Sequence, residues 1–426
     1  MRRVSLRTAS IALALTSALV TSACATTSDS ASGGKSFTYW SMWTQTEPQA
    51  KVLQRSIDAF TAKTGIKVNV QWQGRKVLDK VGPALLAGNA PDLVDQTFDQ
   101  MLPTLAATGQ ARDLTGVLGM DTGEHRKVSD VIPAKLRDIL PAGKDGTPWM
   151  IPYEAITVSL FYNSTAIAGP APKTFDDLLA LCRQAKATGK ACIGTDGDAS
   201  WATTYWFDYL LNRNGGSLPA LAADKSGAAW KNPVVLKTAH QIEQLVKGGY
   251  LIPGYDATKY PEQQNNWATG KSLFFLMGSW LPSETSTFAP QGFQYHSVNF
   301  PSTGDTAKDA VDVIPLGFAV PKKGKNAEAA EKFIAFFLQR SQISGISTTA
   351  GNITPRTDTQ APASLADAAQ SLNQSQTRLP FDNLSPDYED KVLNPVFTDL
   401  WFGKTDAAGF VTKMTSASAD YWKAKG

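Results

Sequence analysis

The spacing of apolar residues near the start of the chain alternates between strand and helix patterns. Residues 47–64 repeat apolar side chains at helical spacing and stop at Gly65, a residue type that commonly ends helices. The flanking segments 36–41 and 66–72 have strand patterns, and in the second of them every other residue from Val68 on is apolar. Strand, helix and strand within so short a stretch predict a β-α-β unit and, with it, a parallel sheet.

The same patterns return further along the chain. They predict helices over residues 175–187 and 326–339 and strands over 191–193, 273–277 and 311–320. Thr174 is a suitable cap for the first of these helices, and Asp176 and Asp177 fall in its first turn, where a helix favours negative charge. We find no internal repeat in the sequence, and the alternation of strands with helices favours the α/β class.

The first residues have the layout of an export signal. Arg2, Arg3 and Arg7 form a basic head, and residues 11–20 form an apolar run. That run is well short of the roughly 20 apolar residues that a membrane-spanning helix needs. We therefore expect residues 1–23 to be a signal peptide rather than a membrane helix.

The apolar run ends in Val20-Thr-Ser-Ala-Cys24, in which small residues precede a cysteine. This resembles a bacterial lipobox, whose cysteine is acylated and becomes the first residue of the mature chain. Thr21 departs from the Leu that most lipoboxes have, and ordinary cleavage nearby, with Cys24 lost or left as a spare thiol, is the alternative. Residues 24–36 contain no large apolar side chain, so we expect a flexible, lipid-anchored tether there.

Composition limits the partners that the protein can have. The chain has 426 residues, of which 42% are hydrophobic and 19% charged, as in ordinary globular proteins. About 400 residues remain without the signal, which exceeds one typical core, so we expect two domains. The net charge of +3 comes from 41 basic and 38 acidic residues, and it is near zero without the N-terminal arginines. Because we see no basic stripe and no basic amphipathic helix, we expect neither nucleic acid nor a membrane surface as a partner.

Two further cysteines, Cys182 and Cys192, lie ten residues apart across a predicted helix-to-strand turn. In an exported protein such a pair suggests a local disulfide, and two reduced, buried thiols are the alternative. A metal site is not expected, because none of the three histidines, His125, His240 and His296, lies near either cysteine in the sequence.

Several stretches, taken in their order along the chain, resemble a known family. The most specific is the phrase F-x-x-x-T-G-I-x-V at residues 60–68. The others are Phe37-Thr-Tyr-Trp-Ser-Met-Trp43, Asn89-Ala-Pro-Asp-Leu-Val94, residues 102–114, residues 151–163, Phe275-Leu-Met-Gly-Ser-Trp280 and Gly317-Phe-Ala-Val-Pro-Lys322. Together they resemble the extracellular solute-binding proteins of bacterial ABC sugar importers, the family that includes maltose-binding protein. Their shared order is a strong signal for the family and a poor one for the ligand.

The resemblance implies a two-lobe, periplasmic-binding-protein-like fold with a hinge and a ligand cleft between the lobes. By that pattern, lobe one comprises residues 37–152 and 278–340, and lobe two comprises 153–277 and 341–426. The resemblance also implies that a carbohydrate binds in the cleft and closes the lobes around it, and the 11 Trp and 11 Tyr of the chain favour an oligosaccharide over a monosaccharide. The closed form would then dock on the permease subunits of an ABC transporter. We expect a monomer without a cofactor, held at the outer face of the cell membrane by its lipid alone.

Carbohydrate recognition needs particular side chains. Pyranose rings pack their C–H faces on aromatic rings, and their hydroxyls need planar side chains that offer paired donors or acceptors. In α/β sheets, ligands lie beyond the carboxyl ends of the strands. Most candidate ligand-binding residues follow a predicted strand or the Ala-Pro-Asp turn, lie at or after a segment where the family crosses between lobes, or belong to an aromatic and polar cluster before residue 214. The candidates are Trp43, Gln45, Glu47, Gln73, Arg75, Asp95, Gln96, Asp99, Tyr153, Glu154, Trp201, Tyr205, Trp206, Trp280, Glu284, Asp312 and Arg356.

These candidates also have structural explanations. Tyr205 and Trp206 could form the packing face of a helix, since aromatic residues dominate buried area. Arg356 could pair with a carboxylate of lobe two. Trp280 is the strongest candidate, because a turn places it and the family commonly has an aromatic residue there.

Other classes of function stay open. A glycoside hydrolase would need two facing carboxylates, which Glu154 and Glu284 could supply, but the sequence has no G-x-S-x-G, H-E-x-x-H or nucleotide-binding glycine motif. A peptide or a polyamine would also suit this fold. The polyamine is the more serious alternative, because it needs carboxylates and aromatic residues together. The protein could also be a solute sensor that does not bind a transporter. The sequence does not distinguish this function, because a surface that docks on a transporter has no recognisable motif.

Overall fold

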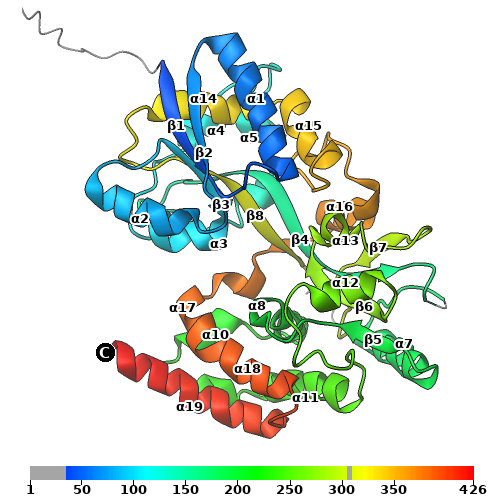
Figure 1. Ribbon diagram of the computed structural model, residues 1–426. Helices are drawn as coiled ribbons and strands as arrows, with labels where there is room; N and C mark the ends of the chain where they lie inside the picture. Colours follow the sequence, from blue (N-terminus) through cyan, green and yellow to red (C-terminus); the bar gives the residue numbers. More distant parts are fainter. Residues whose placement is uncertain (1–34, 168, 305–308) are drawn as a thin grey trace, which may run out of the picture. The chain divides into compact units, whose positions relative to one another are not determined.

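One mixed sheet runs through the computed structural model, which describes residues 35–167, 169–304 and 309–426 (Figure 1). Its strands follow the order β2-β1-β3-β8-β4-β6-β5, with β7 beside β4 and β9 beside β8. Their bounds are β1 (Ser36–Ser41), β2 (Lys67–Trp72), β3 (Leu93–Thr97), β4 (Ile151–Asn163), β5 (Ala191–Gly194), β6 (Ser272–Gly278), β7 (Tyr295–Val298), β8 (Val311–Ala319) and β9 (Thr377–Arg378). Strands and helices alternate along the chain, which confirms the predicted α/β class.

The predicted β-α-β unit is present at the start of the fold. β1 and β2 pair in parallel, with Tyr39 opposite Val70, and α1 (Pro48–Thr64) connects them. Gly65 ends α1 in the left-handed conformation, at a φ of 74° that glycine adopts without steric cost. β3 pairs in parallel with the other edge of β1.

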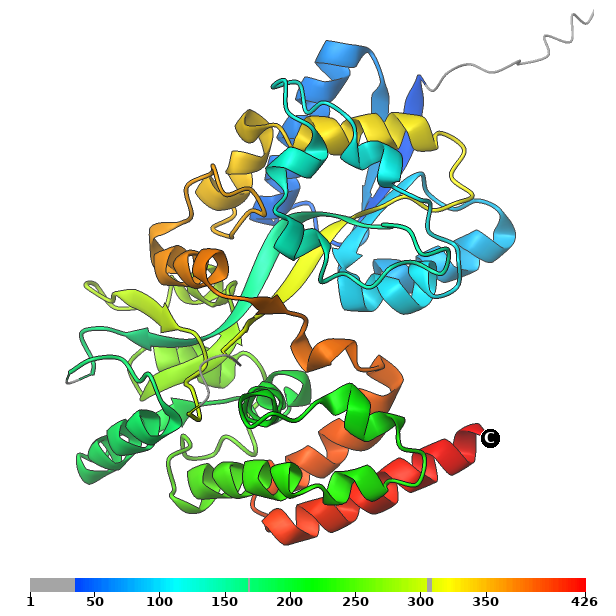
Figure 2. The ribbon, with the colours of Figure 1, turned by 180° about the vertical axis from the view of Figure 1, so that it is seen from behind.

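Two long strands, β4 and β8, join the two halves of the sheet. The first part of β4 pairs antiparallel with almost the whole of β8, and the last part of β8 also pairs with β3. The second part of β4 pairs with β6 and β7. All of β8 and all but the last residue of β4 are buried. The fold therefore has two lobes, a first around β1–β3 and a second around β5–β7, with β4 and β8 crossing between them (Figure 1 and Figure 2).

The core of the first lobe gathers around Phe333 of α14 (Ala327–Phe337), within the helix predicted over 326–339. Its ring centroid lies 5.4 Å from that of Phe60 and 5.9 Å from that of Phe37. The other helices before β4 and after β8 on this side are α2 (Val77–Ala87), α3 (Phe98–Met101), the π-helix η1 (Leu102–Ala106), α4 (Thr115–Leu118), α5 (Val128–Val131), α6 (Ala134–Arg137) and α15 (Arg340–Thr348).

The core of the second lobe is built from stacked aromatic rings. Trp206 stacks on Trp401, with ring centroids 5.9 Å apart, and meets Phe300 at its edge. The helices around it are α7 (Phe175–Ala187), α8 (Ser200–Thr203), α9 (Tyr205–Arg213), α10 (Leu218–Ala223), η2 (Ala228–Lys231), α11 (Pro233–Lys247), α12 (Glu262–Ala268), α13 (Leu281–Thr285), η4 (Ala363–Leu365), α16 (Ala366–Gln374), η5 (Pro380–Asn383), α17 (Pro386–Tyr388), the π-helix η6 (Glu389–Leu393), α18 (Asn394–Trp401) and α19 (Ala407–Lys425).

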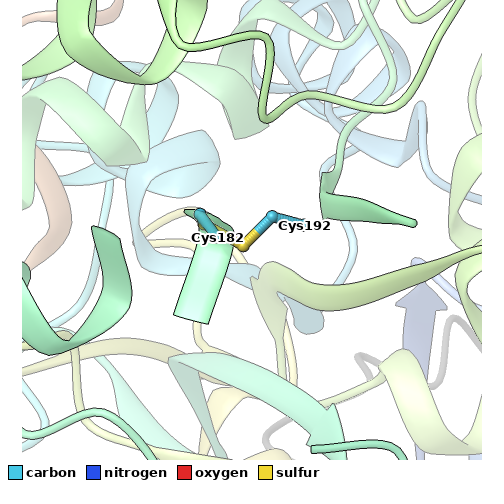
Figure 3. Close-up of a disulfide and its surroundings, with 2 residues drawn as sticks. All are labelled: Cys182 and Cys192. Atoms are coloured by element: carbon cyan, nitrogen blue, oxygen red, sulfur yellow. A yellow bond between two sulfur atoms is a disulfide. The ribbon is translucent and has the colours of Figure 1, made fainter. Parts of the chain in front are cut away.

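Helix α7 has the predicted bounds and the predicted cap. The Thr174 hydroxyl accepts a hydrogen bond from the backbone N–H of Asp177 at 3.1 Å, as an N-cap does. A disulfide between Cys182 of α7 and Cys192 of β5 ties this helix to the edge of the sheet (Figure 3). Both cysteines are buried, and their Cα atoms lie 4.9 Å apart.

Replacing both cysteines with alanine is expected to lower the free energy of unfolding by about 2–3 kcal/mol. The reason is that the unfolded chain regains the entropy of the loop that the bond closes across ten residues. Urea unfolding followed by circular dichroism measures the change. The unaltered protein in a reducing agent should lose a similar amount, and an unchanged unfolding midpoint in the double variant would contradict the expectation.

Some sequence expectations fall on residues 1–34, which lie outside the described residues. They are the signal peptide at 1–23, the acylation of Cys24 and most of the tether at 24–36. Within the described ranges, no helix combines the length and the apolar character that crossing a membrane requires.

The predicted boundaries of the lobes stay a prediction, and two contacts bear on them. β7 pairs with the end of β4, in the second half of the sheet. α15 packs on α1 of the first lobe, where the Ser56 hydroxyl donates to Gln342 at 2.9 Å.

Candidate functional site

A cleft lies between the two lobes, and its larger part is a cavity of about 580 Å³, which we call the first chamber. Both lobes contribute to its wall: Trp43 follows β1, Gln96 lies in β3, Glu154 lies in β4, and Trp280 follows β6. The predicted site residues that line this chamber are Trp43, Glu47, Gln96, Arg75, Glu154, Trp201, Trp280 and Glu284.

Trp43, Glu47 and Arg75 form one unit at the end of β1. The guanidinium of Arg75 lies over the ring of Trp43, 4.6 Å from its centroid, and donates through Nη1 to Glu47 at 3.1 Å. Burial raises the pKa of Glu47, but hydrogen bonds from Arg75 and Thr44 outweigh it, so this pKa lies below its ordinary value. The Glu47 carboxylate is therefore ionised at neutral pH and pairs with Arg75.

Asp95 and Tyr153 lie beneath the chamber wall, and neither lines the cavity. The Tyr153 hydroxyl donates to Asp95 at 2.6 Å and accepts from the indole N–H of Trp43 at 2.8 Å. Asp95 also accepts from the backbone N–H of Met42 at 2.9 Å. These contacts link the first lobe to the crossing strand β4 and orient the ring of Trp43, so the two buried residues act on the site through it.

Glu154 is the most deeply buried charged residue that faces the first chamber. Its side chain is 1% exposed and lines the cavity, yet its Oε2 atom has no hydrogen-bond partner among the described residues. Burial raises the pKa of Glu154 to about 8, with Arg75 opposing the shift and Asp95 adding to it. At neutral pH the carboxyl group is therefore mostly protonated, and it can both donate and accept. Asn352, also 1% exposed, brings a second unpaired oxygen to the same cavity.

Glu154→Gln is expected to flatten the pH dependence of stability in the ligand-free protein. Between pH 4.5 and about 8, the unfolded chain has released the proton of Glu154 while the folded chain keeps it. This contribution to stability is complete below that window and is lost as pH rises through it, by up to about 1.4 kcal/mol per pH unit. Urea unfolding across the window measures the slope. The exposed Glu328→Gln should keep the slope of the unaltered protein, and identical slopes in all three proteins would contradict the assignment.

An aromatic wall faces these groups from the second lobe. The ring centroid of Trp201 lies 6.1 Å from that of Trp280 and 5.7 Å from that of Tyr260. Trp280 folds back over the end of β6, where a Cβ at Gly278 would collide with its ring, so glycine is required there. Glu284 lies at the rim and accepts hydrogen bonds from Tyr260 at 2.7 Å and from Gln264 at 2.9 Å.

A smaller cavity of about 300 Å³, the second chamber, adjoins the first and shares Thr97, Trp201 and Trp280 with it. Of the predicted site residues, Asp99 and Tyr205 line only this chamber. The ring of Tyr205 stacks on Phe381 with centroids 5.3 Å apart.

The structure places the remaining predicted site residues away from both chambers. Trp206 is part of the core of the second lobe. Asp312 is buried and forms an ion pair with Arg378 at 2.7 Å. Arg356 is buried in ion pairs with Glu124 at 2.6 Å and Asp358 at 2.7 Å.

Two polar candidates also lie outside the chambers, near the surface. Gln45 is exposed in the loop after β1. The side-chain amide of Gln73 is hydrogen-bonded to neighbouring residues: it donates to Gln71 at 2.7 Å and accepts from Lys80.

Sequence reasoning missed several residues of the cleft, chiefly Tyr260, Asn352, Phe381 and Glu389. All four lie in irregular segments or short helical turns, where the spacing of apolar residues does not show which way a side chain points. In the described ranges, no group of three or more His, Cys, Asp or Glu side chains is arranged to hold a metal ion.

A two-lobe α/β fold with a polar and aromatic cleft is the architecture of a solute-binding protein. Residues 43–342 match the family described as bacterial extracellular solute-binding protein. The chain belongs to that family, which confirms the resemblance seen in its sequence.

Individual relatives give the comparison more detail. The chain is 26% identical to a diacetylchitobiose binding protein of Streptomyces coelicolor, over 67% of this chain and 62% of that protein. It is 23% identical to a maltooligosaccharide ABC transporter solute-binding lipoprotein of Streptococcus pneumoniae, over 67% of this chain and 64% of that one. The match thus spans less than two thirds of these curated relatives, which are named as binding proteins and not as enzymes. The solved structure of the bacterial solute receptor AcbH has the same fold, with a TM-score of 0.76 at 18% identity, over 92% of this chain and 99% of that one.

Proposed function

We propose that this protein binds a carbohydrate outside the cell and delivers it to an ABC importer, and that the carbohydrate is an oligosaccharide. The observation that carries the proposal is an aromatic wall facing buried, unpaired hydrogen-bonding groups across one cleft. Trp280 and Trp201 offer ring faces to pyranose C–H groups, and Glu154 and Asn352 offer partners to hydroxyls. The names of the curated relatives, which bind diacetylchitobiose and maltooligosaccharide, support a sugar as the cargo.

Binding would act through a shift of population between open and closed lobes. Trp43 and Arg75 come from the first lobe, and Trp280 and Tyr260 come from the second. A ligand that contacts both sets gains more in the closed form and so favours it. In this proposal the crossing strands β4 and β8 form the hinge, β7 moves with the second lobe, and α15 moves with the first. The permease subunits would recognise the closed form.

The proposal includes a lipid anchor at the outer face of the membrane. Residues 1–23 would direct export, Cys24 would carry the acyl groups, and residues 24–36 would tether a monomeric body. The lipoprotein among the relatives supports this arrangement. Growth with radiolabelled palmitate should label the protein, and Cys24→Ala should abolish the label. A protein that stays unlabelled in both forms would exclude the anchor.

A thermal-shift screen against neutral and charged mono- and oligosaccharides, polyamines and short peptides tests the function. A ligand that binds only the native state raises the melting temperature by mass action. We expect one oligosaccharide series to raise it, and the sugar to be recovered unchanged after incubation. Released sugar products would instead favour a hydrolase that uses Glu154 and Glu284. A rise with a peptide or a polyamine alone would keep the fold and overturn the sugar.

A further inference from the structure

Carboxyl groups far outnumber cationic groups in the lining of the cleft. The two chambers together are lined by Glu47, Glu154, Glu284, Asp99, Glu389 and Asp390, and by one cationic residue, Arg75. That guanidinium is already paired with Glu47. A neutral sugar needs hydrogen-bonding groups but no excess of one charge, so the imbalance points to the ligand's own charge.

One of these carboxyl groups is buried in the first chamber. Glu154 is 1% exposed and lines the cavity, with one carboxyl oxygen that no described residue satisfies. A buried polar atom without a partner costs free energy, so its retention in a ligand cleft implies that the ligand supplies the missing hydrogen-bond partner.

The second chamber repeats the arrangement from two sides. Asp99, in α3, comes from the first lobe, and Glu389, in η6, comes from the second. Burial raises the pKa of Glu389 to about 8, and among the neighbouring charges Asp99 adds most to the shift. Among the residues that the structure describes, neither carboxyl group has a cationic partner, and no Lys, Arg or His lines this chamber. With no described cation beside it, Glu389 therefore mostly keeps its proton at neutral pH, and a cation between the two carboxyl groups would stabilise both in their ionised form.

Aromatic rings complete the second chamber. Trp201, Tyr205, Trp280 and Phe381 lie in its wall. The faces of such rings carry negative potential and attract cations, while the same faces pack on the C–H groups of a sugar. Carboxylates and ring faces together suit an ammonium group that is attached to a pyranose.

We propose that the ligand is an oligosaccharide with free amino groups, whose ammonium group occupies the second chamber between Asp99 and Glu389. The inference rests on the proposed function, since the sugar ring is assigned to Trp280. A linear polyamine would satisfy the carboxylates and the cation-attracting ring faces, but it has no pyranose face to pack on the indole of Trp280 and no hydroxyl for the amide of Asn352. N-acetylation of the sugar would remove the positive charge of its amino group, and the described lining of the second chamber supplies no positive charge of its own.

Isothermal titration calorimetry with one matched series tests the proposal. The probes are cellotetraose, the tetramer of β-1,4-linked glucosamine and its fully N-acetylated form, which differ only in the group at C2, with spermidine and maltotetraose beside them. The glucosamine tetramer is expected to bind at least about tenfold more tightly than the other sugars, the gain expected from one hydrogen bond between charged groups. Its affinity should fall with added salt.

Variants assign that preference to the second chamber. The double change Asp99→Asn and Glu389→Gln should remove the tenfold preference for the glucosamine tetramer over the neutral tetramers. Asp420→Asn, an exposed carboxylate on α19, removes one charge elsewhere and should leave the preference intact. Melting temperatures of all the variants show that each one is folded.

The outcomes separate this inference from the function on which it rests. Equal or tighter binding of cellotetraose, maltotetraose or the N-acetylated tetramer would overturn the amino-sugar assignment and keep the sugar-binding function. Binding of spermidine without any sugar would overturn both. A preference for glucosamine that survives the double change would place the cation elsewhere and overturn the role of the second chamber.

Discussion

Replacing Arg378 with methionine is expected to lower the free energy of unfolding by about 3–5 kcal/mol, the cost of leaving buried charges without their partner. Arg378 contacts Asp208 through Nη2 at 2.7 Å and through Nη1 at 3.2 Å. Its Nε atom lies 2.7 Å from Asp312, and its Nη1 atom lies 3.1 Å from Asp382. The side chains of Asp208 and Asp312 are almost wholly buried, so water cannot replace the lost guanidinium.

The electrostatics of this cluster support the direction of the effect. Burial lowers the pKa of Arg378, but the carboxylates of Asp208 and Asp312 outweigh it and hold the pKa far above its ordinary value, so the group stays charged. Burial likewise raises the pKa of Asp312, and Arg378 opposes that shift. Removing the cation leaves several carboxyl groups facing one another in a region of low dielectric constant.

The same cluster also holds a strained piece of the cleft wall. Phe381, Asp382 and Asn383 have positive φ angles of 55°, 50° and 62°, which cost about 1–3 kcal/mol each in residues other than glycine. The backbone N–H of Phe381 donates to Asp208 at 2.9 Å, and Phe381 lines the second chamber. The loss of Arg378 should therefore loosen this wall as well as destabilise the fold.

Chemical denaturation with urea measures the predicted loss. Lys413→Met, which removes a partly exposed ion pair with Asp399, should cost less than about 1 kcal/mol. Arg378→Lys keeps the charge but not the paired geometry, so it should fall between the two. A loss no larger for Arg378→Met than for Lys413→Met would refute this account of the cluster.

Trp280→Ala is expected to weaken binding of the oligosaccharide by about 1–3 kcal/mol, in proportion to the apolar area that an aromatic platform buries against a sugar. Trp280 borders both chambers and contacts Trp201, so its loss removes the surface that the two chambers share. Isothermal titration calorimetry on the folded variant gives the change in affinity directly.

Two further variants make this result specific. Trp280→Phe keeps an aromatic face and should restore part of the affinity. Trp422→Ala removes an indole that donates to Ala222 in the second lobe, away from the cleft, and should leave the affinity as it was. Equal affinities for the unaltered protein and for Trp280→Ala would remove Trp280 from the site.

Local signals allowed the parts of the fold near them to be predicted. Thr174 and the apolar spacing after it gave α7 its correct bounds, and the turn at Gly278 brought Trp280 to the cleft. The antiparallel pairing of β8 with β3 and β4 had no local signal, because it depends on how the chain returns between the lobes.

The site was harder to predict, because position along a strand does not show what a side chain contacts. Asp95 is a candidate because it follows the Ala-Pro-Asp turn and Tyr153 because it lies at the first crossing between the lobes, and the structure directs them to each other and to Trp43. Arg356 pairs with Glu124, a residue 232 positions away. Such long-range partners decide whether a polar side chain is free for a ligand, and a single sequence does not record them.

The exposure of Trp201 has a practical consequence. This indole is 41% exposed, whereas Trp43, on the other side of the first chamber, is 5% exposed. A ligand that enters the chamber removes water from Trp201, so the emission of the protein should become brighter and move to shorter wavelength. The fluorescence of Trp201 therefore reports whether the cleft is occupied. Rapid mixing with ligand would give the rate of the fluorescence change, and with it the rate at which the lobes close, without any attached dye.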